Sequence, residues 1–467
     1  DNTISPSTWS TSAVWSETWL SPDATFWILL DGPSWQTLPD DYECNIQAKE
    51  KKPPFEGIVL KAKLIGGGKY ELLYEKFIPE WEKKTGAKVI ILSKKHHFAL
   101  DREIKKDIAA GTLNWDIASN HISFAPQYPD IYIDLYKYLS EEDLAPFFPR
   151  IIKACTIKGR LVQLPRHGDI SNLYYRKSVY KRYGFTPPET WDELKEQAIK
   201  MSNPPDFYGT VFVGKEEALT GRFYEMLMAN GGSLFTEDWK PAFNSSAGIK
   251  TLRWFVDLYQ ANAVPPGCIN YLWDDTANAF ASGTVATTYD WGGWSTYFNN
   301  PKTSKVAGDV WIVRFGKGDA GIYSGWSGCH TFSVTKTSKH KEAAVDLIKF
   351  LTSFEAAYFQ AKTIGYCPQR EDVWQKIIAE AKAEGDEYTY NKLLVWYKSL
   401  KEDAFPVPLI PEWVRFSDIL YPELQKAILG EKTIEEALND AAEATYELMK
   451  ESGYYKPGVP KYEKPAW

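Results

Sequence analysis

Apolar positions alternate between two spacings in the first regular part of the chain. Leu73, Phe77 and Trp81 recur at helical spacing, and a glycine follows where that helix should end. Shorter apolar runs on either side are typical of strands, and the resulting β-α-β-α-β order predicts a parallel sheet covered by helices. The predicted strands cover residues 58–65, 88–92 and 115–118, and the predicted helices cover residues 70–84 and 101–110.

Later stretches keep a helical period, and the chain shows no internal repeat or low-complexity tract. In open α/β sheets, ligands bind at the carboxyl ends of strands. Two such ends are the loops over residues 66–69 and 120–124. The later predicted helices cover residues 191–201, 247–261, 341–352, 373–384 and 434–450.

The length of 467 residues predicts two or three domains, and the apolar share of 44% is enough to build their cores. Residues 1–57 differ from the rest, because they are rich in Ser, Thr, Pro and Trp and show no sustained period. Flexible tethers are usually poor in aromatic residues. We therefore expect this extension to pack on the surface of a lobe.

Charge narrows the expected partners, whereas the cysteines leave the cellular compartment open. The net charge is −7, so nucleic acid is not an expected partner. No run of 18 apolar residues predicts a membrane span, and if the protein is exported, we expect the printed sequence to be the mature form. The five cysteines show no CxxC pair; one disulfide is possible, and the compartment stays open.

Aromatic residues are abundant, with 19 Trp and 28 Tyr. A flat ring covers the C–H face of a sugar well while the sugar hydroxyls point to polar groups. Such rings are suited to a carbohydrate ligand, although most of them are expected to lie in the core or on the surface.

Five phrases of the sequence carry a more specific pattern, which extends from about residue 58 to about residue 450. They are FIPEWEKKTGAKVIIL, LVQLPRHGDISNLYYRKSVYKRYGFTPPETWDELKEQAIKM, FASGTVATTYDWGGW, GWSGCHTFSVTKTSKHKEAAVDLIKFLTS and IPEWVRFSDILYPELQKAILGEKTIEEALNDA. Taken in this order, they resemble the maltose-binding-protein (family 1) branch of the bacterial extracellular solute-binding proteins of ABC transporters.

The resemblance implies an α/β fold with two lobes, the type II periplasmic-binding-protein fold, in which a hinge joins the lobes around a central ligand cleft. Ligand contact with both lobes would close the hinge and shift the population to the shut form. The crossings between lobes are expected near residues 163–168, 313–321 and 363–368. The expected parts are the extension 1–57, an N-lobe over 58–165 with 314–364, and a C-lobe over 166–313 with 365–467.

The resemblance also places ligand contacts on this sequence. Lys69 stands where the family has a ligand-contacting lysine, Asp169 where it has an acidic residue after the first crossing, and Trp294 where it has a stacking tryptophan. Asn120 and Ser123 replace a Trp and an Asp of the family, so the pocket is expected to differ in detail.

Neighbouring residues extend the predicted site. Arg166 and His167 crowd Asp169, and a salt bridge between Arg166 and Asp169 is the alternative to a ligand contact. A plain surface loop is the alternative for the loop residues, and core packing is the alternative for the tryptophans. The predicted ligand-binding residues are Lys69, Asn120, His121, Ser123, Arg166, His167, Asp169, Arg222, Asp290, Trp291, Trp294, Trp326, Arg370 and Trp413.

Trp413, Arg222 and Arg370 carry further alternatives. Ser417 stands where the family has a second stacking tryptophan, and Trp413 lies one helical turn before it, from where it could fill the same space. If Arg222 and Arg370 both line the cleft, an anionic or phosphorylated ligand becomes plausible.

Signatures of catalysis are absent from the sequence. GxGxxG at a helix start, Walker A, GxSxG and HExxH do not occur, and the six histidines are too scattered to predict a metal site. A glycoside hydrolase needs two carboxylates across the bond, and Asp169 with Asp290 is the pair that could supply them.

We therefore predict the solute-binding component of an ABC importer, and not an enzyme. It is expected to capture a sugar, oligosaccharide or polyol without a cofactor and to deliver it to a membrane permease. A monomer in the periplasm or outside the cell is expected, and a sensor with the same fold stays open. The departures at Asn120, Ser123 and Ser417 argue against assuming maltose.

Overall fold

The computed structural model describes residues 52–464 of the chain. Most of the predicted extension lies outside this range, so its packing on a lobe stays a prediction. Near its end, Phe55 stacks on Trp81 with ring centroids 6.2 Å apart. Among residues 52–464, no helix combines the length and the apolar character that a membrane span requires.

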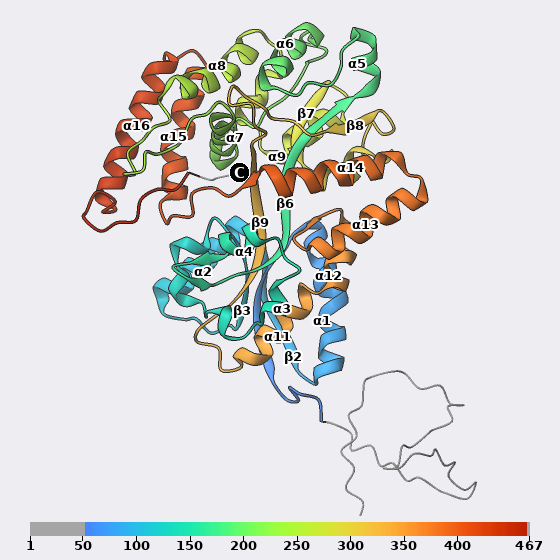
Figure 1. Ribbon diagram of the computed structural model, residues 1–467, viewed down its shortest axis with the longest axis vertical. Coiled ribbons are helices and arrows are strands. Elements are labelled where there is room, and N and C mark those ends of the chain that lie inside the picture. The colour runs from blue at the N-terminus through green and yellow to red at the C-terminus, as the bar shows by residue number, and fades with distance from the viewer. Residues whose placement is uncertain (1–51, 465–467) are drawn as a thin grey trace, which may run out of the picture. The chain divides into compact units, whose positions relative to one another are not determined.

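The described residues form two α/β lobes that share one nine-stranded sheet (Figure 1). Its main path runs β10-β6-β9-β3-β1-β2, β11 pairs with β9, and β7 and β8 pair with β6. The strands are β1 (Val59–Ile65), β2 (Lys88–Lys95), β3 (Ile117–His121), β6 (Leu164–Arg176), β7 (Thr287–Trp291), β8 (Val310–Val313), β9 (Gly325–Val334), β10 (Cys367–Pro368) and β11 (Ala404–Phe405), beside a separate hairpin of β4 (Thr156–Ile157) and β5 (Arg160–Leu161).

The first lobe is built on parallel pairing of β1 with β2 and β3, as the sequence predicts. On the helix after β1, Leu73, Phe77 and Trp81 are all buried, and Gly86 ends it with a φ of 75°, which favours glycine. The helices of this lobe are α1 (Glu71–Thr85), α2 (His97–Ala110), α3 (Glu141–Leu144), α4 (Pro149–Ala154), α11 (Lys341–Leu351) and α12 (Phe354–Phe359).

The second lobe is mostly helical and has the larger apolar core. Its sheet consists of the second half of β6 with β7 and β8, all antiparallel. The helices are α5 (Lys177–Tyr183), α6 (Trp191–Met201), α7 (Glu216–Ala229), α8 (Ser246–Gln260), α9 (Trp273–Ala281), α10 (Ser295–Phe298), α13 (Glu371–Glu384), α14 (Glu387–Lys398), α15 (Trp413–Ile428) and α16 (Ile434–Glu451), with π-helical turns at Gln360–Ile364 and Ser399–Asp403.

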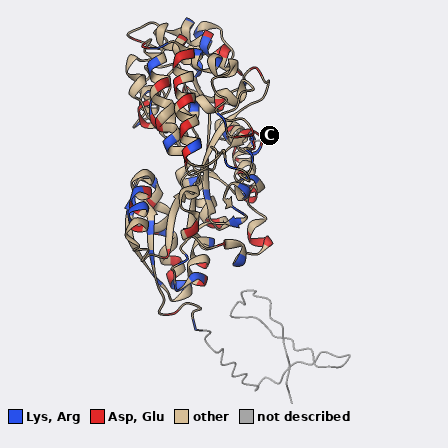
Figure 2. Cartoon of the chain, turned by 90° about the vertical axis from the view of Figure 1, so that its left-hand side faces the viewer, with Lys and Arg blue, Asp and Glu red and all other residues tan. Residues whose placement is uncertain are grey.

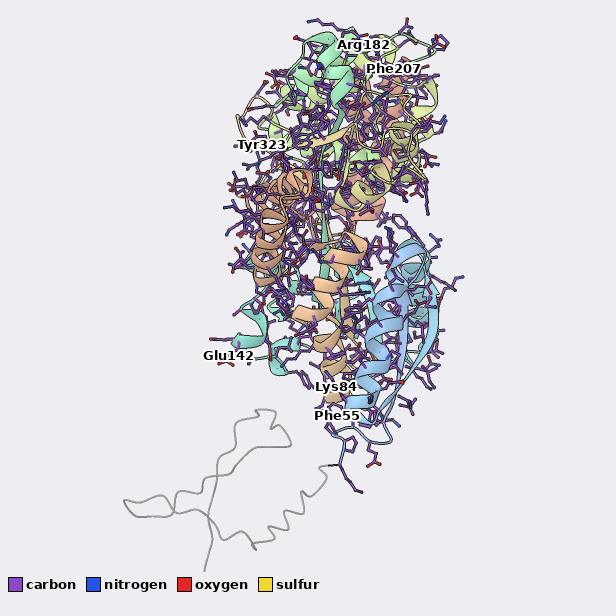
Figure 3. The ribbon with its side chains drawn as sticks, turned by 90° about the vertical axis from the view of Figure 1, so that its right-hand side faces the viewer. Phe55, Lys84, Glu142, Arg182, Phe207 and Tyr323 are labelled. Carbon is purple, nitrogen blue, oxygen red and sulfur yellow. The ribbon has the colours of Figure 1, made fainter. Side chains whose placement is uncertain are left out.

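Two long antiparallel strands, β6 and β9, pass between the lobes (Figure 1). Residues 313–321, which were predicted as the second crossing, do not pass between the lobes. Phe315 and Trp326 pack in the core of the second lobe, and Tyr323 lies in that lobe with Arg182 and Phe207 (Figure 3). The chain returns to the first lobe only along β9, and the predicted lobe boundaries otherwise stay predictions.

Charges of both signs are intermixed on the helices of both lobes (Figure 2). This distribution agrees with the small net charge of −7. The four cysteines among residues 52–464 are buried and unpaired: Cys155, Cys268, Cys329 and Cys367.

Candidate functional site

One side of the crossing strands gathers five of the fourteen predicted site residues. In the strand register His167 lies opposite His330, Asp169 opposite Gly328, and Ser171 opposite Trp291. Side chains two residues apart on a strand share a face. We call this surface the crossing-strand face. From the first lobe to the second it carries His121, His330, His167, Asp169, Ser171, Trp326 and Trp291.

A histidine cluster occupies the first-lobe end of this face. It consists of His97, His121, His167 and His330 with Tyr70 and Tyr366. The imidazole of His330 is the centre, with ring centroids 4.8 Å from His167, 5.1 Å from His121 and 5.6 Å from His97. His167 also stacks flat on Tyr366 at 4.1 Å. The cluster therefore joins both crossing strands to the end of β3 and the start of α2.

Burial keeps these imidazoles uncharged. It lowers the pKa of His121 to about 4 and holds the pKa values of His167 and His330 well below the ordinary range. Because unpaired charge is costly in such a place, the neutral rings are favoured at neutral pH. Tyr70 Oη lies 3.2 Å from His330 Nε2, whereas neither ring nitrogen of His167 has a hydrogen-bond partner among the described residues.

Asp169 lies between the two ends of the face. Its side chain is 22% exposed, and one carboxylate oxygen lies 3.9 Å from His330 Nε2. Burial raises the pKa of Asp169 to about 7. No described side chain donates a hydrogen bond to this carboxylate, so its oxygens have room for an external donor.

Arg166 does not form the salt bridge with Asp169 that was the alternative to a ligand contact. Its guanidinium donates to Gln360 Oε1 at 2.8 Å, to Tyr74 Oη at 2.7 Å and to the Tyr70 carbonyl at 3.0 Å. The side chain is 2% exposed. We therefore assign Arg166 to the packing of β6 against α1.

A tryptophan cluster of Trp273, Trp291 and Trp326 occupies the second-lobe end of the face. The three rings meet at centroid distances of 5.0, 5.3 and 5.9 Å. Trp326 is buried, and the other two are half-buried. Arg222 lies 4.8 Å from the Trp273 ring and 5.2 Å from the Trp291 ring, which places a cation against their π-faces.

Arg222 is fully engaged by the protein. It donates to Glu225 Oε1 at 2.6 Å, to Ser171 Oγ at 2.8 Å and to the Tyr289 carbonyl at 3.0 Å. Glu225 also accepts from the Trp326 amide at 3.0 Å. This buried pair fixes the rings around it and leaves no free positive charge for a ligand.

Asp290 points away from the crossing-strand face. In the register it pairs with Asn172, on the other side of the sheet from Ser171 and Trp291. It is fully buried and accepts from the Trp291 amide and from Thr276 Oγ1, both at 2.8 Å. Burial raises the pKa of Asp290 to about 7.

Lys69 and Trp294 lie where the lobes approach each other. Lys69 Nζ donates to Thr296 Oγ1 of the second lobe at 3.2 Å. Trp294 is half-buried and packs edge-on against Tyr297 at 5.7 Å. Lys69 thus contacts both lobes, and a role of Lys69 or Trp294 in ligand binding stays a prediction.

The predicted loop residues Asn120 and Ser123 use their polar atoms inside the first lobe. Asn120 is the fourth residue of β3, and its amide donates to Tyr132 Oη at 3.0 Å. Ser123 Oγ bonds to His121 Nδ1. These contacts orient His121 and leave it as the member of this group that reaches the face.

Arg370 and Trp413 lie in neither cluster. Arg370 pairs with Asp372 at 2.7 Å over the ring of Phe147. Trp413 is fully buried, and its indole N–H donates to Glu217 Oε1 at 2.6 Å. Core packing, the alternative noted for the tryptophans, describes the surroundings of Trp413.

Sequence reasoning missed several members of the clusters. His97, His330, Tyr70, Tyr366 and Trp273 come from five separate segments, so no local motif announces them. The one available signal was the alternation of side chains along β6 and β9. It places His167 and His330 on the same face once the pairing of the two strands is known.

Comparisons with known proteins bear on the family and the fold. The family model for bacterial extracellular solute-binding proteins matches residues 67–358. The chain belongs to this family. Maltose-bound MalE3 of T. maritima has 26% sequence identity and a TM-score of 0.74, over 84% of this chain and 100% of that one.

Curated relatives carry names for different solutes. The mannitol-binding protein of Pseudomonas aeruginosa is 26% identical over 67% of this chain and 75% of its own length. A Sinorhizobium fredii protein, 29% identical over 65% of this chain and 69% of its own length, is named for amino-acid transport. The expected family and two-lobed fold are confirmed, while the solute is not given by these names.

Proposed function

We propose that this protein binds a sugar or polyol on the crossing-strand face, between its lobes, and delivers it to the permease of an ABC importer. One observation carries the proposal. The half-buried ring of Trp291 lies on the same face as Asp169 and contacts the ring of Trp273, and the Asp169 carboxylate accepts no hydrogen bond from the described side chains. Rings of this kind cover sugar C–H groups, and a carboxylate accepts hydroxyl protons.

The transport role rests on the family. Its members are extracellular binding proteins, so we propose a periplasmic or cell-surface location and a membrane permease as partner. Lys69 and Thr296 already meet across the lobes, and a solute that contacts both lobes would favour the shut form in which they do so. Recognition of the shut form would couple capture to delivery.

The same geometry favours binding over hydrolysis. A glycosidase needs two carboxylates that flank one bond. Asp169 lies on the crossing-strand face, whereas Asp290 points to the other side of the sheet and is bonded to Thr276. The pair that the sequence offered for hydrolysis is thus separated by the strands themselves.

The structure does not support the anionic ligand that the sequence left open. That idea depended on Arg222 and Arg370 lining the cleft together. Arg222 is paired with Glu225, and Arg370 is paired with Asp372. A neutral polyhydroxylated solute therefore fits the described charges better.

The test is a thermal-shift screen against mono-, di- and oligosaccharides, polyols, sugar phosphates and amino acids. A ligand at 100 times its Kd should raise the unfolding free energy by about 2.7 kcal/mol. Trp291→Ala should lower the affinity for the best sugar or polyol about tenfold, because it removes a stacking ring. Trp311→Ala removes another half-buried tryptophan, outside both clusters, and should leave the affinity unchanged.

Three results would contradict the proposal. Stabilisation by amino acids alone would replace the solute class, and equal affinity of wild type and Trp291→Ala would move the site off the crossing-strand face. Steady cleavage of an oligosaccharide by the purified protein would restore the hydrolase alternative.

A further inference from the structure

Five of the six histidines lie in one group, although the sequence scatters them. His96 extends the histidine cluster, since its ring centroid lies 4.0 Å from that of His97. Only His340 lies apart, before α11. Binding of a sugar by stacking and a carboxylate does not require so many imidazoles in one place, so the group calls for a function of its own.

Three side chains in this group converge on one point. His167, Asp169 and His330 each offer one ligand atom, and these atoms all lie within 4.8 Å of one another. His167 and Asp169 stand two residues apart on β6, and His330 faces His167 from β9. The backbone pairing of two strands, rather than a loop, sets their positions.

Buried ring nitrogens without partners provide a second, independent observation. His167 is 1% exposed, and neither of its nitrogens has a hydrogen-bond partner among residues 52–464. His330 is 5% exposed, and its Nδ1 also lacks one. A buried polar atom without a hydrogen-bond partner destabilises the folded protein. A bound group that accepts the one lone pair of each neutral imidazole would remove part of that cost.

We propose that His167, Asp169 and His330 bind one divalent transition-metal ion of the zinc class. Two imidazoles and one carboxylate are a donor set that such ions accept, and three protein ligands leave one coordination position open. Bonds of about 2.0–2.2 Å require donors closer together than the widest separation here, so small side-chain rotations must accompany binding. His121 and Tyr70 stand next to His330 and can hold its ring in place.

The surrounding charge sets a limit on affinity. Asp169 supplies the only carboxylate of the three ligands, and the guanidinium of Arg166 lies nearby, where it stacks on Tyr70 at 5.4 Å. Arg166 is held by three hydrogen bonds and cannot move away easily. We therefore expect reversible binding that a chelator removes, in contrast to a structural zinc site.

The open coordination position would allow the metal ion to bind an oxygen atom of the solute. Asp169 is the exposed member of the set and lies next to the tryptophan cluster on the same face. A hydroxyl oxygen of the solute would take the open position while its ring stacks on Trp291. This part of the inference rests on the proposed function, whereas metal binding itself does not.

The first experiment measures metal uptake alone. The full chain is freed of metal with a chelator and titrated with Zn²⁺ by calorimetry and with Co²⁺ by visible absorption. We expect one ion per chain and the absorption of a four-coordinate Co²⁺ site. His330→Gln, His167→Gln and Asp169→Asn should each weaken binding at least tenfold, while the matched control His340→Gln should bind as wild type does.

Uptake that none of the three ligand variants weakens would overturn the site, as would no uptake by the wild type. Circular dichroism and urea unfolding of each variant show whether it is folded, and Asp169→Asn keeps the shape of its side chain. The second experiment repeats the sugar and polyol screen with and without Zn²⁺. Metal uptake without any solute overturns only the proposed function, and solute binding without metal uptake overturns only the metal site.

Discussion

The two ends of the crossing-strand face differ in how their polar atoms are satisfied. In the tryptophan cluster, Arg222 uses three hydrogen bonds to Glu225, Ser171 and the Tyr289 carbonyl. In the histidine cluster, His167 is equally buried and uses none. The polar atoms of Arg222 are therefore satisfied within the protein, while the ring nitrogens of His167 have no partner among the described residues.

The two acidic residues repeat the contrast. Burial raises the pKa of both Asp169 and Asp290 to about 7. Asp290 is fully buried and accepts two hydrogen bonds, whereas Asp169 is 22% exposed and accepts none from described side chains. Similar pKa values therefore accompany two different surroundings. Asp290 is bonded within the protein, whereas the carboxylate of Asp169 is open to a ligand.

The largest expected effect on stability comes from breaking the Arg222–Glu225 pair of the tryptophan cluster. Arg222→Met should lower the free energy of unfolding by about 3–5 kcal/mol, because it leaves Glu225 buried without its cation. Urea unfolding followed by tryptophan fluorescence measures the change. The rings of Trp273 and Trp291 should also become more exposed to a quencher.

The double variant Arg222→Met with Glu225→Gln is the control. Removing both charges should recover at least about 1 kcal/mol of the loss, because no unpaired charge remains. Simple addition of the two single losses would show that the pair does not act as a unit.

Asp290 gives the next effect, as a dependence on pH. A folded pKa near 7, against an ordinary value of 3.8, means that the folded protein holds a proton that the unfolded chain has released. The unfolding free energy therefore falls as the pH rises from about 4 to 7 and is level above that, by at most roughly 4 kcal/mol for this group.

Asp290→Asn should remove this contribution, so the difference in unfolding free energy between variant and wild type should change across that interval. Asp169 keeps its own contribution in the variant. A difference that is flat between pH 4 and pH 8 would mean that Asp290 is ionised in the folded protein throughout.

Local sequence pattern was sufficient for much of the fold. The predicted helix over residues 191–201 matches α6, and the predicted strand over 58–65 matches β1 within one residue. Helical spacing and Gly86 place the end of α1 in the same way. Each of these depends on contacts close in sequence, which the order of apolar residues reveals.

The site depended on pairing between distant segments. His167 was predicted as a ligand contact from its place beside Asp169, but His330 lies 163 positions later and reaches it only through the β6–β9 register. The same limit explains the return crossing, which was expected near residue 313 and lies on β9. Trp413 was selected by similarity of position, and only the fold shows its N–H committed to Glu217.

Trp413 tests the difference between a core ring and a ring of the face. Trp413→Phe removes the hydrogen bond to Glu217, whose pKa burial raises to about 7, and should cost about 1–3 kcal/mol of stability. Solute affinity should stay at the wild-type value, in contrast to Trp291→Ala. A weakened affinity in Trp413→Phe with unchanged stability would place Trp413 in contact with the solute.

The smallest effect on stability is expected for His167 in the histidine cluster. It gives the most direct comparison with Arg222 in the tryptophan cluster. His167→Phe keeps a ring against Tyr366 and removes two nitrogens that have no partner among the described residues. Without metal, the free energy of unfolding should change by less than about 1 kcal/mol, because no hydrogen bond is lost and an unpaired buried polar group disappears. With Zn²⁺, wild type should gain stability and the variant should not. A loss comparable to that of Arg222→Met in metal-free buffer would show that His167 is already satisfied within the protein, and the contrast between the two clusters would no longer hold.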